Sequence, residues 1–139
     1  MSRRLLASTI CAALLLAFGA SQASAFDLHV RFPKTQPHAG QAWPIKVHAE
    51  RHGSGKPIHG AALYKFLLNG NPVATSYPSP NSPPCQGGAR HRPWHFVGTF
   101  RDKLCFPKRS VGIQLTLRVI VKAGPLGTKH RDHNIVVKP

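Results

Sequence analysis

Acidic residues are scarce in this sequence. Its 139 residues include 19 Lys and Arg but only four Asp and Glu, which are Asp27, Glu50, Asp102 and Asp132. Hydrolysis by a pair of carboxyl groups requires two acids that face one another across a substrate. Four acids spread along the chain argue against that chemistry, and they leave a formal net charge of +15.

Other common catalytic motifs are absent as well. No G-x-S-x-G sequence occurs, and the serines cluster in segments with the composition of loops. A nucleophilic serine needs support from a histidine and an acid, and no such set stands out. No glycine-rich phosphate-binding loop is present either. We therefore expect a protein that is not an enzyme.

Only one apolar run is present, and it lies at the N-terminus. A short basic segment precedes a run from Leu5 to Phe18, and the small residues of an A-x-A cleavage site follow. The run is too short to span a bilayer, which takes ~20 apolar residues. Residues 1–25 are predicted to be a signal peptide cleaved before Phe26. The remaining 26–139 has the length of one domain, expected to be secreted or envelope-associated (extracellular or periplasmic) without a membrane anchor.

The three cysteines divide between these two parts. Cys11 falls within the predicted signal peptide, which leaves Cys85 and Cys105 in the domain. An even number of cysteines in an oxidising compartment predicts one disulfide, and a loop of about 20 residues closed in this way stabilises a fold by about 3 kcal/mol. Two free buried thiols are the alternative. The absence of a C-x-x-C spacing disfavours a metal–thiolate pair.

The hydrophobic pattern has the two-residue period of β-strands, and no helical stripe of useful length occurs. The dipeptide Asn69-Gly70 predicts a tight hairpin, because both residues tolerate positive φ. About seven short strands separated by turn signals predict an all-β, immunoglobulin-like sandwich of antiparallel strands. The expected strand segments are 26–32, 43–50, 62–68, 73–77, 94–106, 113–122 and 134–138.

The segment 78–93 interrupts this pattern. It is rich in Pro, Gly and Ser and has no periodicity, so we expect a long irregular loop that is either functional or mobile. The predicted disulfide would attach the middle of this loop to the next strand. Trp94 follows the loop, and we expect it to begin a core strand. The alternative is an exposed ring among cations, which would suit stacking on sugars or bases.

Several motifs carry a resemblance to a protein family. They are A-G-x-x-W-x-I at 39–45, F-L-L-N-G-x-x-V at 66–73, F-x-G-x-F-x-D-x-L-x-F-P at 96–107 and V-G-x-x-L-T-x-R-V at 111–119. The domain resembles uncharacterised secreted bacterial proteins with a single immunoglobulin-like (fibronectin III-like) domain. This resemblance implies the fold and the compartment, and it implies no activity. The insertion at 78–93 with its cysteine departs from such proteins.

The strongest functional signal is the basic charge. Removing Arg3 and Arg4 leaves 17 Lys and Arg against four acids in residues 26–139, a net charge of +13 that attracts polyanions. We predict a secreted binding or structural module that associates, in a salt-dependent way, with anionic cell-wall polymer or another extracellular polyanion. A role of the charge in solubility alone is the alternative. The predicted polyanion-binding residues are Arg90, Arg92, Arg101, Lys103, Lys108 and Arg109.

The nine histidines support a second hypothesis, a copper or zinc site. His130, Asp132 and His133 are the best candidate ligands, because imidazole and carboxylate groups bind both metals. The simpler interpretation places these histidines on a solvated face, and no cofactor is then expected. A third hypothesis is a protein partner that binds a sheet edge or the Pro-rich loop, for which the sequence offers no specific residue.

Overall fold

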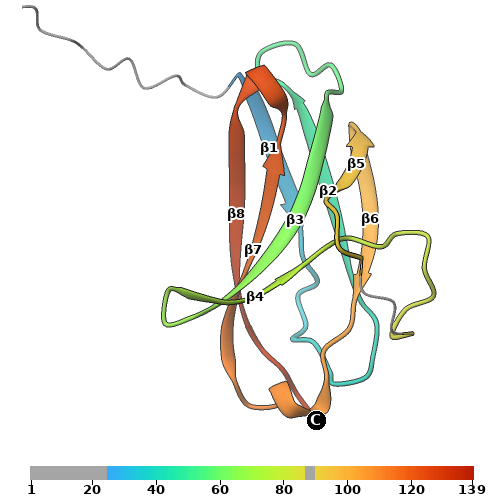
Figure 1. Cartoon of the computed structure of the whole chain (residues 1–139), viewed down its shortest axis with the longest axis vertical. Coiled ribbons are helices and arrows are strands. Elements are labelled where there is room, and N and C mark those ends of the chain that lie inside the picture. Colours follow the sequence, from blue (N-terminus) through green and yellow to red (C-terminus); the bar gives the residue numbers. More distant parts are fainter. Residues whose placement is uncertain (1–24, 87–89) are drawn as a thin grey trace, which may run out of the picture.

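The computed structural model describes residues 25–86 and 90–139 (Figure 1). The predicted signal peptide therefore lies outside the described residues, apart from Ala25. The described part forms an all-β sandwich of eight strands in two sheets. The immunoglobulin-like fold class predicted from the sequence is confirmed, with eight strands in place of about seven.

The two sheets are antiparallel throughout. One has three strands in the order β1-β2-β6, and the other has the order β4-β3-β7-β8 with β5 pairing beside β3. In Figure 1, β1 and β2 lie behind β3 and β7. Two single turns of 3-10 helix, η1 (Lys108–Ser110) and η2 (Gly124–Leu126), flank β7. The strands are β1 (Phe26–Arg31), β2 (Trp43–Arg51), β3 (His59–Leu68), β4 (Asn71–Ser76), β5 (Trp94–Val97), β6 (Thr99–Leu104), β7 (Gln114–Lys122) and β8 (Thr128–Val136).

Strand alternation fills the core as the sequence predicts. The inward positions of β2 and of β7 from Leu117 onward are all buried, and the polar side chains between them face outward. Full burial of one such aliphatic or aromatic side chain stabilises the fold by about 1.5–3 kcal/mol. The predicted hairpin is also present, because Asn69 and Gly70 have φ of 51° and 80° between β3 and β4. Ile113 differs from the prediction, since it precedes β7 and is 40% exposed.

The predicted strand 94–106 is wrong in one respect, because it consists of two strands in different sheets. β5 pairs with β3, whereas β6 pairs with β2, and Gly98 carries the chain from one sheet to the other. Gly98 has φ of +66°, a conformation that glycine adopts without strain. Its N–H donates to Ile58 and its carbonyl accepts from Ala49, so the crossing point is fixed on both sides.

Replacing Gly98 with alanine is expected to lower the free energy of unfolding by about 2–3 kcal/mol. The added Cβ would lie 2.8 Å from the Cβ of Pro57, and the positive φ would strain any residue other than glycine. Urea denaturation followed by tryptophan fluorescence measures the change. Gly40→Ala is the matched control, because Gly40 also has positive φ but has nothing within 4 Å of the added Cβ. Equal losses in both variants would show that the clash with Pro57 does not matter.

Candidate functional site

Two of the four acids, Asp132 and Asp27, form ion pairs with Arg or Lys. Arg118 donates two hydrogen bonds of 2.8 Å to Asp132, and these lower the pKa of that carboxyl group. Asp27 accepts a 2.8 Å hydrogen bond from the ring of His52, which lowers its pKa in the same way, and Lys129 lies 3.6 Å away. Each of these carboxylates is thus matched by a cation of its own.

Glu50 and Asp102 have partners of other kinds within the protein. The Nε2 atoms of His48 and His29 lie 3.0 and 3.6 Å from the carboxylate of Glu50. Asp102 is buried inside the sandwich, where it accepts hydrogen bonds from the Tyr64 hydroxyl and from the backbone N–H groups of Ser79 and Lys103. Within residues 25–86 and 90–139, neither of these two carboxylates has a Lys or Arg nitrogen within 4 Å.

Most of the basic side chains therefore lack an acidic partner. Of the 17 Lys and Arg in residues 26–139, only Arg118 and Lys129 lie within 4 Å of a carboxylate in the described structure, which leaves 15. Such an excess creates a positive potential that adjacent cations reinforce. The position of these 15 cations on the fold decides where an anion would bind.

Three of them form a row across the outer face of the three-stranded sheet. Arg31 of β1 pairs directly with Lys46 of β2, and Lys46 pairs directly with Arg101 of β6. Neighbouring strands are about 4.8 Å apart, and like charges placed directly opposite destabilise a sheet. Lys103 lies two residues beyond Arg101 on the same outward face. The sheet thus presents four adjacent cations where a neutral surface would be more stable.

Three adjoining hollows extend this row in both directions. The first, about 730 Å³, is lined by Arg31, Lys46 and Arg131. The second, about 600 Å³, shares Arg31 and Lys46 with the first and adds the two β6 cations. The third, about 790 Å³, shares Lys103 with the second and lies beside the disulfide. We call the cations of these hollows the cationic track: Arg31, Lys46, Arg90, Arg101, Lys103, Arg109 and Arg131.

The structure brings together four of the six predicted polyanion-binding residues. Arg101 and Lys103 lie side by side on β6, and Arg90 and Arg109 line the third hollow. Arg92 and Lys108 are exposed but line none of the three hollows.

Sequence reasoning left three track residues out of the site, namely Arg31, Lys46 and Arg131. The first two occupy outward positions in predicted strands, so alternation already places them on a sheet surface. Their alignment with Arg101 depends on the register of β2 against β6, which are not consecutive in the chain. Arg131 joins them because β8 lies against β1 at the sandwich edge, where Lys129 reaches Asp27.

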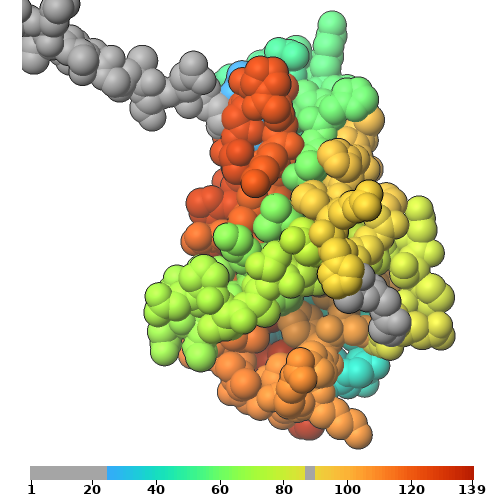
Figure 2. Space-filling view, in the orientation of Figure 1, coloured from blue at the N-terminus to red at the C-terminus, as the bar shows by residue number. Residues whose placement is uncertain are grey.

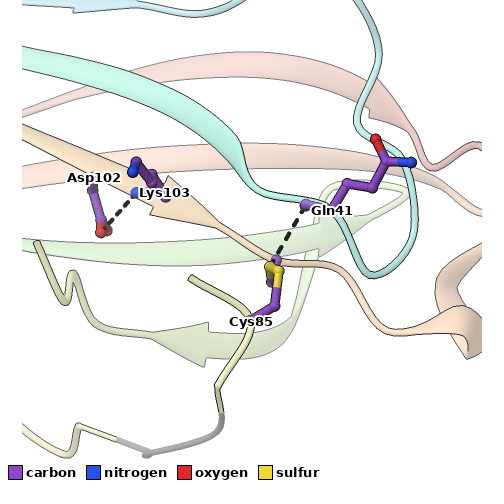
Figure 3. Close-up of a disulfide and its surroundings, with 5 residues drawn as sticks. Gln41, Cys85, Asp102 and Lys103 are labelled. Carbon is purple, nitrogen blue, oxygen red and sulfur yellow. Dashed lines mark hydrogen bonds between the residues drawn. A yellow bond between two sulfur atoms is a disulfide. The ribbon is translucent and has the colours of Figure 1, made fainter. Parts of the chain in front are cut away.

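The loop between β4 and β5 forms one wall of the track. The predicted disulfide between Cys85 and Cys105 is present, with Cα atoms 5.2 Å apart, and it attaches the loop to the chain just after β6 (Figure 3). The backbone N–H of Ser79 forms the second attachment, to the carboxylate of Asp102. Figure 2 shows the side of the molecule on which β3, β4 and β5 lie in front, with part of the loop after β4 on the right.

Trp94 begins β5 and packs against the core, as predicted. The guanidinium carbon of Arg90 lies 4.6 Å from the centre of its ring, which is a cation–π contact. Part of the ring is therefore covered by the protein's own cation. Trp94 positions Arg90, and we do not assign it as a stacking surface for a ligand.

The candidate metal ligands do not converge. His130 and Asp132 point outward from β8, whereas His133 has the opposite orientation and stacks on Phe32 with ring centroids 4.3 Å apart. Both oxygens of Asp132 accept from Arg118. Across residues 25–86 and 90–139, no group of three or more His, Cys, Asp or Glu side chains is arranged to hold a metal ion.

The partly buried position of His133 predicts a pH-dependent contribution to stability. Burial among Phe32 and Trp43 lowers the pKa of this imidazole below its ordinary 6.5. The unfolded chain therefore binds the proton more readily, so the stability from neutral His133 is present above pH 6.5 and is lost as the pH falls through the folded-state value. Thermal melts between pH 8 and 5 should show a smaller drop for His133→Phe than for the wild type. Parallel curves would contradict this role of the imidazole.

Comparison with protein-family models, with curated proteins and with solved structures finds no match to this chain. The resemblance to secreted immunoglobulin-like proteins thus remains a prediction from motifs. Within the described residues, no helix has the length and apolar character needed to cross a membrane.

Proposed function

We propose that this protein is an exported, non-enzymatic module that binds anionic polymer of the cell envelope through the cationic track. One observation carries the proposal: Arg31, Lys46 and Arg101 stand opposite one another on adjacent strands without an acidic partner. Because such a row destabilises the free protein, a bound anion would relieve its repulsion.

The form of the surface favours a polymer over a small anion. The track consists of shallow adjoining hollows on a rigid sheet, so its cations are spread over the face of the domain and do not converge on one point. A polymer can contact many of them at once, each contact being weak alone. Such binding releases counterions and falls steeply as the salt concentration rises.

Co-sedimentation of the purified protein with cell envelopes, in the presence of a chelator and across a salt series, tests this function. We expect the bound fraction to be high at low salt and to fall steeply between 50 and about 200 mM salt. The chelator removes any contribution from a metal ion. Absence of binding at the lowest salt concentration would overturn the proposal and would assign the charge to solubility.

A further inference from the structure

The hollows at the two ends of the cationic track extend beyond the three-stranded sheet that carries its middle. Its middle residues, Lys46 and Arg101, belong to the three-stranded sheet. The first hollow, however, reaches Arg131 of β8, and the third hollow is lined by Phe66 of β3 and Thr75 of β4. These strands belong to the five-stranded sheet. Because packed sheets are about 10 Å apart, the track bends around both edges of the three-stranded sheet.

This bend restricts the shape of a ligand that could fill the whole track. A straight rod laid on the outer face would contact the central cations, and the cations at both ends of the track would remain without contact. Duplex DNA is such a rod on this scale, since its persistence length is about 150 base pairs. A flat membrane surface would likewise contact the central cations and not those at the two ends. A single flexible chain has no such restriction and could follow the surface from β8 to the disulfide.

The composition of the walls suits an anionic chain along the full length. The sequence contains no acid between Glu50 and Asp102, so the loop wall brings no negative charge to the ligand. That wall contributes Ser79 and Ser82, which line both the second and the third hollow. Two carboxylates line the hollows, Asp132 in the first and Asp102 in the second and third. Asp132 is paired with Arg118, and Asp102 is buried and hydrogen-bonded to Tyr64, so neither side chain is exposed as a free anion.

We propose that the ligand is a flexible single-chain polyanion that wraps around the three-stranded sheet from Arg131 to Arg109. This inference rests on the proposed function and adds the shape and class of the polymer. It predicts that the end cations contribute to binding of a flexible chain and contribute nothing to binding of a rod. The number of cations engaged should also differ between the two ligands.

The experiment uses long-chain inorganic polyphosphate as the flexible probe, with a 30-base-pair DNA duplex and anionic phospholipid vesicles as the rigid and flat probes. For polyphosphate, seven engaged cations should give a slope of log K against log salt of about −5, using about −0.7 for each cation. The double variant Arg109→Gln/Arg131→Gln should weaken polyphosphate binding roughly 30-fold and reduce the slope magnitude by about 1.4. Binding of the duplex should be unchanged.

The matched control is Lys65→Gln/Lys122→Gln, which removes the same charge from the opposite face of the sandwich. An equal effect of both double variants, or equal loss of duplex and polyphosphate binding in the end variant, would overturn wrapping and leave the proposed function standing. If the vesicles bind as tightly as polyphosphate, the wrapping model is also overturned. No binding of any probe at low salt would overturn the proposed function itself. Thermal melts verify that each variant is folded.

Discussion

Replacing Arg31, Lys46 and Arg101 together with glutamine is expected to weaken polyphosphate binding about a hundredfold at low salt. A Lys or Arg near an anionic surface contributes about 1 kcal/mol, and three of them therefore contribute about 3 kcal/mol, or a little over two powers of ten in affinity. These residues form the centre of the track, so rigid and flexible ligands should both be affected. Titration monitored by tryptophan fluorescence measures the loss.

The same variant should be as stable as the wild type or more stable. Directly opposed like charges cost a few tenths to about 1 kcal/mol for each cross-strand pair, and the triple variant removes two such pairs. Its melting temperature should therefore rise at low salt. The gain should shrink at higher salt, because salt screens the repulsion between these cations in the wild type. The control with Lys56, Lys65 and Lys122 replaced should keep its affinity within a few-fold. A destabilised triple variant, or a control that loses affinity equally, would contradict the assignment.

The sequence predicts the positions of most strands because local alternation decides which side chains are buried. It misses residues 128–133 of β8, since the predicted last strand begins only at residue 134. It also predicts the disulfide, since two cysteines in the domain have only one pairing. It does not predict that the chain crosses from one sheet to the other at Gly98. The same pattern of inward aromatic residues continues through β5 and β6, although β5 pairs with β3 and β6 pairs with β2. Burial in each strand is a local property, whereas sheet membership depends on contacts between distant strands.

The candidate site is only half predicted for the same reason. Charge composition indicates a polyanion-binding surface, and sequence proximity gathers Arg101 with Lys103 around the disulfide. The row with Lys46 requires the register between β2 and β6, which tertiary packing sets. A histidine pattern counted along the chain gives a misleading group, because β-strand alternation turns His133 away from His130.

One local signal was available and concerns Asp102. It occupies an inward position between Phe100 and Leu104, so alternation alone places a carboxylate in the core. A buried carboxylate needs hydrogen-bond donors, and Tyr64 of the opposite sheet supplies one from a side chain that is fully buried. Burial, and then the nearby charge of Asp102, raise the pKa of the Tyr64 hydroxyl well above its ordinary value. The phenol thus stays protonated and remains a donor to the carboxylate.

Replacing Asp102 with alanine is expected to lower the free energy of unfolding by on the order of 4 kcal/mol. The change leaves the hydroxyl of Tyr64 buried without an acceptor and removes the partner of the Ser79 and Lys103 N–H groups. Tyr64→Phe should cost about 2 kcal/mol, because it deprives a buried charge of one donor. Urea denaturation of the two single variants and the double variant gives the coupling between them, which should exceed 1 kcal/mol.

The loop provides a second readout that separates this network from general core damage. The N–H of Ser79 donates to Asp102, whereas Cys85 is held by the disulfide. Asp102→Ala should therefore increase proteolytic cleavage between these two attachments, under conditions in which the sandwich stays folded. Leu117→Ala, a cavity variant in the buried core of β7 that leaves the hydrogen bonds of Asp102 intact, should lower stability by a similar 2–5 kcal/mol without that local cleavage. Equal cleavage in both would mean that Asp102 stabilises the core without holding the loop, and the wall of the track would then depend on the disulfide.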